Sequence, residues 1–253
     1  MKTTRQLLAA AALIVTGVAP ALAQGTTFQN GSFDAGQTGW TLWGDAQIRT
    51  TGSKTAVLST ATTAYEDDAP LPAGFNNNSG VSPVNFYEAP SIAGLLPTAL
   101  DIGGYAIEAS AISQDFFATA GDTLSIKFDW AFLSTESINP DFAFIAINDT
   151  VVKFTDAFTL PNVSTFNSTF GDFNDVAWGW SNASFSYTAN ASGAVRLVLG
   201  VVDLNDDLST SELRLDNISV SAVPEPETIA MLLAGLGVIG AAARRRAPAR
   251  TAA

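Results

Sequence analysis

The amino-acid sequence predicts an all-β domain, an antiparallel β-sandwich, over residues 24–222. Within Leu124–Phe132 and Val195–Val201, large apolar residues recur at every second position, which is the period of a strand with one buried face. Short turn-forming stretches separate such rows along the chain. No part of this region sustains the 3.6-residue period of an amphipathic helix. Many short strands joined by turns are typical of a sandwich.

The individual strands can be placed in order. Phe142–Ile147 is a short apolar run between two turn-forming pairs, which predicts a buried strand. Phe185 and Tyr187 alternate with polar residues, as in a half-buried strand. Turns are expected at residues 51–53, 120–122 and 190–193. The other expected strands are Trp40–Thr50, Thr55–Thr60, Tyr105–Ala118 and Glu212–Ser221.

The segment Ala61–Gly104 departs from this pattern. It contains five prolines and the run Asn76-Asn77-Asn78, with few strand signals. A segment this long without secondary structure is unusual in a compact domain and is often functional. It is interpreted either as a long loop insertion or lid, or as a loop lying across the sandwich. Its aromatic residues are Tyr65, Phe75, Phe86 and Tyr87.

The first 23 residues have the three parts of a secretory signal peptide. Lys2 and Arg5 precede the apolar core Leu7–Val18, and Ala21-Leu22-Ala23 is an A-x-A cleavage site. We therefore expect export through the Sec pathway and a mature chain that begins at Gln24.

The C-terminal segment 223–253 also has three parts. Pro224-Glu225-Pro226 is followed by Thr228–Ala243, which has no charge, and then by Arg244-Arg245-Arg246. Sixteen helical residues would extend about 24 Å, against about 30 Å for the bilayer core. The arginines resist translocation, so the pattern predicts a short single transmembrane helix with a cytoplasmic stop-transfer block. The alternative is a buried apolar helix with a basic end.

This tail resembles the PEP-CTERM sorting signal, with Pro224, Glu225 and Pro226 as the sorting motif. The resemblance implies a Gram-negative bacterium, transient anchoring in the inner membrane and recognition by an exosortase-type processing enzyme. It also implies a final location at the cell surface or in an exopolysaccharide or biofilm matrix. A glycosylphosphatidylinositol signal would end in the apolar stretch, without Arg244, Arg245 and Arg246.

Charge and composition exclude several classes of function. Residues 24–222 hold six basic and 22 acidic residues, a net charge of −16. Such a body repels polyanions, which disfavours nucleic acid and anionic membrane surfaces as partners. The chain has no Cys and no His, which excludes Ser-His-Asp and Cys-His catalysis and His-based metal sites. Glycoside hydrolysis by two carboxylates remains open, but no pair stands out.

The domain also resembles the galactose-binding-like jelly roll of carbohydrate-binding modules. The resemblance lies in Asn30-Gly31-Ser32-Phe33-Asp34 with Gly39-Trp40 near the start, and in Leu213–Val220 at the end. It implies that the opening and closing segments pair, and that a structural Ca²⁺ lies near Asn30, Asp34 and Asp216. The alternative is that Asp34 and Asp216-Asn217 cap turns or form a β-bulge, since the apolar period shifts at Asp216-Asn217.

Two further groups of residues resemble parts of binding sites. Asp203–Asp207 has the D-x-N-x-D start of an EF-hand loop, but Leu208 and Arg214 occupy the positions of its Gly and Glu, so a solvated turn is expected. Trp178 and Trp180 are candidates for a sugar-binding platform, followed by Trp40 and Trp43, with core packing as the alternative.

The sequence thus predicts an exported surface or matrix protein with a structural or glycan-binding role and no enzymatic activity. A matrix-modifying glycoside hydrolase is the alternative.

Overall fold

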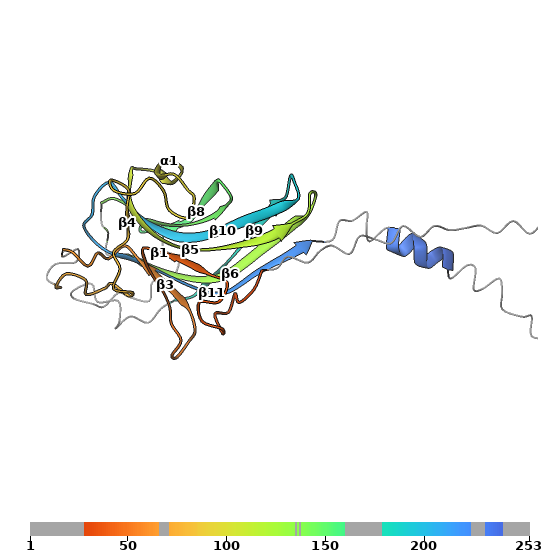
Figure 1. Ribbon diagram of the computed structural model, residues 1–253, viewed down its shortest axis with the longest axis horizontal. Helices are drawn as coiled ribbons and strands as arrows, with labels where there is room; N and C mark the ends of the chain where they lie inside the picture. Colours follow the sequence, from red (N-terminus) through yellow and green to blue (C-terminus); the bar gives the residue numbers. More distant parts are fainter. Residues whose placement is uncertain are drawn as a thin grey trace, which may run out of the picture.

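The computed structural model describes residues 28–65, 71–134, 136, 138–159, 179–223 and 231–239. Two antiparallel sheets pack face to face, as Figure 1 shows, so the predicted all-β sandwich is confirmed. The six-stranded sheet has the order β1–β5–β10–β7–β8, with β4 also paired to β5. Its strands are β1 (Thr41–Trp43), β4 (Val84–Asn85), β5 (Ala106–Ala118), β7 (Phe142–Ile147), β8 (Thr150–Asp156) and β10 (Gly193–Leu204).

The five-stranded sheet has the order β2–β3–β11–β6–β9. Every pairing in both sheets is antiparallel. Its strands are β2 (Asp45–Ile48), β3 (Ala56–Ser59), β6 (Thr123–Ser134), β9 (Ser181–Thr188) and β11 (Ser211–Val223). A short helix, α1 (Pro97–Leu100), lies between β4 and β5 in the chain.

The main core fills the space between the sheets. The predicted row on β6 faces inward, with Phe128 1% and Trp130 7% exposed, and so does the row on β10. Phe128 stacks on Phe185 of the neighbouring strand β9, with ring centroids 5.8 Å apart. The alternation visible in the sequence therefore identifies the inward faces of both sheets.

The chain changes sheets at Gly44. β1 belongs to the six-stranded sheet and β2 to the five-stranded one, with only this residue between them. Gly44 has φ +68°, and a Cβ atom there would stand 2.7 Å from Ser110 Oγ and 2.8 Å from the Ala109 carbonyl oxygen. Only glycine combines this conformation with so close an approach. The sequence predicted one strand over Trp40–Thr50, and this glycine is why it is two.

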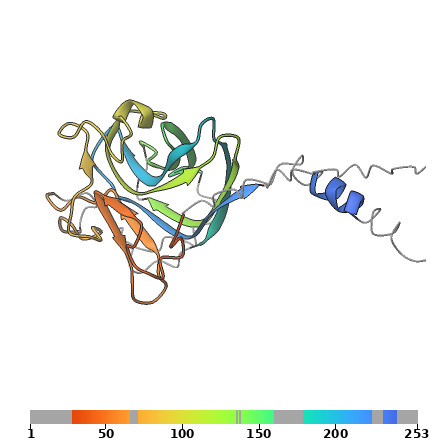
Figure 2. The ribbon, with the colours of Figure 1, turned by 45° about the vertical axis from the view of Figure 1, so that its right-hand side comes forward.

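A second core lies on the outer face of the six-stranded sheet. Ile92, Ala93, Leu95 and Leu100, each at most 2% exposed, pack on apolar residues of β5, β7 and β10. Figure 2 shows α1 and the adjoining chain on this outer side. The described part of residues 61–104 thus includes a loop packed across the sandwich, and it holds β4 and α1, which the sequence did not predict.

β8 was also not predicted. Its sequence, TVVKFTD, has neither a regular alternation nor a long apolar run, and its burial pattern is correspondingly mixed. The strand forms because the turn at Asn148-Asp149 returns the chain along β7, where Ile145 pairs with Val152. Pairing with an already buried strand decides this element, not its own composition.

At the C-terminal end, the described residues resume at 231 with a helix that continues to 239. Its apolar side chains are exposed, including Met231 at 74% and Val238 at 71%. Within the described ranges, no helix has both the length and the hydropathy needed to cross a membrane. The predicted span Thr228–Ala243 is described only at residues 231–239. The predicted signal peptide lies outside the residues that the structure describes.

Candidate functional site

A shallow pocket opens where β5 begins, between this strand and the segment that covers the sheet. We call it the tyrosine pocket. Its volume is about 240 Å³. β4 positions one wall, because the N–H of Phe86 donates to the Ile107 carbonyl oxygen at 2.9 Å. The lining residues are Phe86, Tyr87, Pro97, Asp101, Tyr105, Ala106 and Ile107.

Two tyrosines on this pocket are strongly exposed, Tyr87 at 81% and Tyr105 at 75%. Their backbones are nevertheless held in place. The N–H of Tyr87 donates to Asn85 Oδ1 at 2.9 Å, and the N–H of Tyr105 donates to Asn205 Oδ1 at 2.9 Å. The carbonyl oxygen of Tyr105 also accepts from the Asn205 N–H at 2.8 Å. The pocket therefore presents two aromatic rings on a fixed backbone.

Asp101 supplies a carboxylate to the same pocket. It follows α1, and its Oδ1 accepts from the N–H of Ala106 at 2.8 Å, which orients the side chain. No basic residue lines this pocket within the described part of the chain. An oriented carboxylate accepts hydrogen bonds from hydroxyl groups, and flat aromatic faces pack against C–H surfaces. Aromatic faces with a few polar groups suit a hydroxylated ligand such as a sugar.

A second pocket, of about 230 Å³, lies at the other end of β5, around Arg196. Its guanidinium forms a bidentate pair with Asp115, at 2.7 and 2.9 Å, and also donates to the Ala93 carbonyl oxygen. Hydrogen bonding to Arg196 lowers the pKa of Asp115. Asp149 is a second carboxyl in this pocket. A carboxyl with a lowered pKa is poorly suited to the general acid of a glycoside hydrolase.

The three residues predicted to hold Ca²⁺ lie in one region, but with other partners. Asn30 Nδ2 donates to the carbonyl oxygens of Gly36 and Thr38, and its Oδ1 accepts from the Ala35 N–H. Asp34 accepts from Ser32 and Lys54, and these contacts lower its pKa. The Asn30 contacts are those of a turn cap, which the sequence did not predict for this residue.

Asp216 belongs to a β-bulge, as the shift in apolar period predicted. The pairing of β11 with β6 is interrupted between Asp216 and Ser219, and Asn217 has φ +50°. Burial raises the pKa of Asp216, and the nearby Asp129 and Asp34 add to this. In the described ranges, no group of three acidic residues is arranged to hold a metal ion. A Ca²⁺ at Asn30, Asp34 and Asp216 stays a prediction.

The opening and closing segments do meet at Gly31, whose carbonyl oxygen accepts from the Ile218 N–H at 2.9 Å. A Cβ at Gly31 would overlap the Ile218 carbonyl. We expect Gly31→Ala to lower the free energy of unfolding by about 3 kcal/mol, the upper part of the range for overpacking, because backbone rather than a side chain must move. Urea unfolding measures this. Ser32→Ala, at an exposed neighbour, is the control and should cost less than about 1 kcal/mol; equal losses would contradict the close approach.

The predicted tryptophan platform is described only in part. Trp180 stands just before β9 and is 42% exposed, whereas Trp178 lies outside the described residues. The secondary candidates were wrong as platforms. Trp40 is 4% exposed and donates from Nε1 to the Asn30 carbonyl oxygen, and Trp43 packs on the outer core and donates to Ser113. Their large apolar rings are used in packing, as is usual for this residue.

The prediction of a solvated turn at Asp203–Asp207 was wrong for its first two residues, because Asp203 and Leu204 are buried in β10. Asp203 is the penultimate residue of β10 and is 1% exposed, whereas Asn205 and Asp207 are exposed. The two-residue alternation on β10 does extend from Val201 to Asp203, so the inward position was readable. The expectation that an acidic residue faces solvent overrode this signal.

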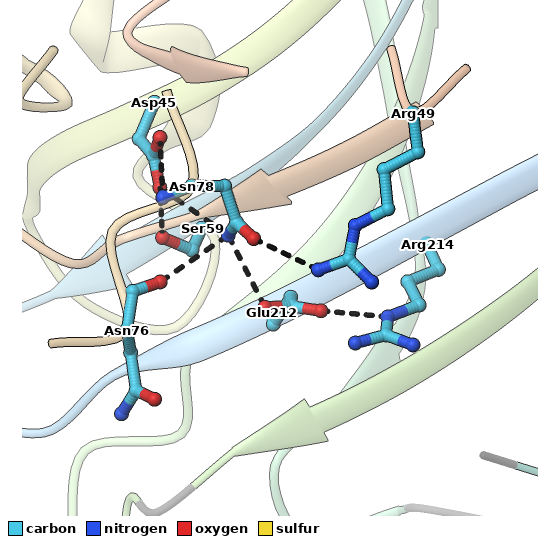
Figure 3. A network of polar contacts seen from close by, with 7 residues as sticks. All are labelled: Asp45, Arg49, Ser59, Asn76, Asn78, Glu212 and Arg214. Atoms are coloured by element: carbon cyan, nitrogen blue, oxygen red, sulfur yellow. Dashed lines mark hydrogen bonds and ion pairs between the residues drawn. The ribbon is translucent and has the colours of Figure 1, made fainter. Parts of the chain in front are cut away.

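A network of buried charges, not predicted from the sequence, anchors the loop at residues 76–79 to the five-stranded sheet (Figure 3). Asp45, fully buried, accepts from the N–H groups of Asn78 and Ser79 and from the Ser59 hydroxyl. Glu212, 2% exposed, accepts from Arg214 at 2.7 Å and from Asn78 Nδ2 at 3.2 Å. Arg49 donates to Asn78 Oδ1 at 3.1 Å. Two acids and two arginines thus balance, which suits a structural role.

Comparisons with known proteins address the tail and the fold. Residues 222–246 match the model of the PEP-CTERM protein-sorting motif. No curated protein matches the chain. Among solved structures, a CBM61 carbohydrate-binding module in complex with β-1,4-galactotriose is similar at 10% identity, covering 78% of this chain and 97% of that one, with a TM-score of 0.39. A CBM4 structure covers 76% and 99%, at 11% identity and a TM-score of 0.37.

The N-terminal cellulose-binding domain of β-1,4-glucanase C from Cellulomonas fimi is similar at 10% identity, covering 78% of this chain and 97% of that one, with a TM-score of 0.33.

The matched range 222–246 includes both sets of residues predicted in the tail. They are the sorting residues Pro224, Glu225 and Pro226 and the stop-transfer residues Arg244, Arg245 and Arg246. All six lie outside the residues that the structure describes. The chain therefore has a PEP-CTERM protein-sorting motif at its C-terminus, the mark of an exported protein sorted to the cell envelope or surface.

Proposed function

We propose that this protein is processed by an exosortase-type enzyme and then binds a neutral polysaccharide at the cell surface or in the extracellular matrix, through the tyrosine pocket. The observation that supports binding there is the pair of exposed tyrosines, Tyr87 and Tyr105, on backbones fixed by Asn85 and Asn205 beside the carboxylate of Asp101. A tyrosine side chain has only two χ angles, so it loses little conformational entropy when a ligand packs on it.

The charge of the body supports a neutral ligand. Residues 24–222 have a net charge of −16, and one of the acidic residues counted there, Asp101, lines the pocket itself. A uronate-rich or sulfated polysaccharide would meet repulsion that falls with ionic strength. A neutral chain offers hydroxyl donors to Asp101 without that penalty.

A binder is favoured over the hydrolase alternative by the pockets themselves. The tyrosine pocket has one carboxyl among its described lining residues, whereas hydrolysis of a glycosidic bond needs two. In the Arg196 pocket, Asp115 is held in an ion pair with Arg196. Hydrogen bonding to Arg196 lowers the pKa of Asp115, which makes this carboxyl a poor proton donor to a leaving group.

The test is binding of the full chain, purified in mild detergent, to the producing organism's own exopolysaccharide. We expect Tyr87→Ala and Tyr105→Ala each to weaken binding about tenfold, equivalent to about 1.4 kcal/mol, because each removes one aromatic contact. Affinity electrophoresis or calorimetry measures the change.

Two other exposed aromatic residues provide controls. Phe158→Ala, at the end of β8, should bind like the unmodified chain. Trp180→Ala tests the platform predicted from the sequence. A loss confined to the Trp180 variant would move the site to β9, and no binding by the folded unmodified chain would refute glycan binding altogether.

A further inference from the structure

Three carboxyl groups are buried at one end of the sandwich. Glu108 on β5 and Asp203 on β10 are direct cross-strand partners, and Asp141 lies immediately before β7. Their exposed fractions are 3%, 1% and 0%. Directly opposite side chains on neighbouring antiparallel strands have Cβ atoms about 5 Å apart. Glu108 and Asp203 are therefore two like-charged groups held side by side in the interior.

The hydrogen bonds of this cluster leave one oxygen without a partner. Asp141 accepts from the Leu204 N–H at 3.2 Å and from the Ser211 hydroxyl at 2.7 Å. Asp203 Oδ1 is buried and has no hydrogen-bond partner. In an ionised Asp203 carboxylate, this buried oxygen would carry negative charge without a hydrogen bond, which is costly in a protein interior.

The charged groups that act on Asp203 are all acidic. They are Glu108 on β5, Asp141 before β7, Glu136 in the segment before it, and Asp206 in the turn after β10. The neighbouring strands also contribute Asp156 on β8 and Glu212 on β11, but these are paired with Lys153 and Arg214. The basic residues on these neighbouring strands, Lys153 and Arg214, are thus already paired with acids other than Asp203.

Neutralisation by protons agrees with this geometry better than neutralisation by a cation, because the described acids do not form a group able to hold a metal ion. Burial, reinforced by the neighbouring carboxylates, raises the pKa of Asp203 to about 12. Burial also raises the pKa of Asp141, to about 8. Both groups therefore remain protonated where exposed aspartates are ionised.

We propose that Asp203, Glu108 and Asp141 form a proton-dependent lock that closes this end of the sandwich. A protonated carboxyl donates a hydrogen bond, so neighbouring acids attract each other instead of repelling. The lock connects β5, β7 and β10 with Ser211 of β11, which joins the two sheets. Loss of the protons places like charges side by side in the interior and loosens this end.

The direction of the pH effect follows from proton counting. Unfolded aspartates release their protons near pH 4, whereas the folded protein keeps them to higher pH. Between about pH 4 and pH 8 the folded state binds more protons than the unfolded state. The contribution of the lock to stability is therefore complete below pH 4 and is lost as the pH rises.

The experiment is thermal unfolding of the full chain in mild detergent between pH 5 and pH 9, in EDTA. Asp203→Asn is nearly isosteric and permanently neutral. We expect it to raise the melting temperature by at least about 3 °C at pH 8, with a smaller gain at pH 5. Glu108→Gln tests the same pair from the other strand, should the first variant fail to fold. Asp149→Asn, at an exposed turn, is the control. It also removes a carboxyl group, but it should not raise the melting temperature in this pH-dependent way.

A second arm replaces EDTA by millimolar Ca²⁺. The proposal expects the difference in melting temperature between the unmodified chain and Asp203→Asn to be the same with and without the ion. Stabilisation of the unmodified chain by Ca²⁺ that Asp203→Asn abolishes would overturn the proton lock and assign the cluster to a cation. A melting temperature lowered at every pH by both neutral variants would equally refute it. None of these readouts depends on glycan binding.

Discussion

Replacing Glu212 with alanine is expected to lower the free energy of unfolding by about 3–5 kcal/mol, because the change removes a buried carboxylate that accepts from Arg214 and Asn78. The side chain of Arg214 is 13% exposed, and its Nε lies 2.7 Å from Glu212 Oε1. Burial raises the pKa of Glu212 despite this pair, and burial lowers that of Arg214. Burial of this pair thus costs free energy, and removal of one partner costs more.

The loss should extend to the loop at residues 76–79. Asn78 Nδ2 donates to Glu212, and the Asn78 side-chain oxygen accepts from Arg49, so one truncation disturbs both contacts. Equilibrium unfolding in urea measures the change. Lys54→Ala breaks the exposed pair with Asp34 and is the control, with an expected loss below about 1 kcal/mol.

A double variant separates pairing from packing. Glu212→Leu with Arg214→Leu removes both charges of the pair together, so it should recover much of the loss. If Glu212→Ala costs no more than Lys54→Ala, the network does not have the structural role assigned to it.

The second large effect is expected in the tail. Replacing Pro224 and Pro226 with alanine should abolish processing, so that the full-size chain accumulates in the membrane fraction of the producing organism. Both prolines lie inside the matched sorting motif, and alanine in their place favours continuation of a helix toward the sandwich. Fractionation followed by immunoblotting measures the distribution.

Pro248→Ala is the matched control, because this proline lies beyond residue 246, where the motif ends. It should be processed and released like the unmodified chain. Normal release of the Pro224/Pro226 variant would show that these prolines are not what the processing enzyme reads.

The sequence alone determined the strands whose side chains alternate. In Leu124–Phe132 each second residue enters the core, and this local period is independent of the partner strand. The bulge at Asp216-Asn217 was equally readable, since a bulge changes the period within one strand. The sorting motif is also a local pattern, because it consists of consecutive residue types.

Only the tertiary structure decided the sites. Tyr87 and Tyr105 stand eighteen positions apart and come to one pocket because β4 and Asn205 hold their two segments at the start of β5. Glu108 and Asp203 meet through the register of β5 and β10, which no local pattern encodes. Glu212 and Asp45 are buried because a distant loop covers the outer face of their sheet. Local periodicity identifies which face of a strand is apolar, whereas proximity and burial depend on long-range pairing.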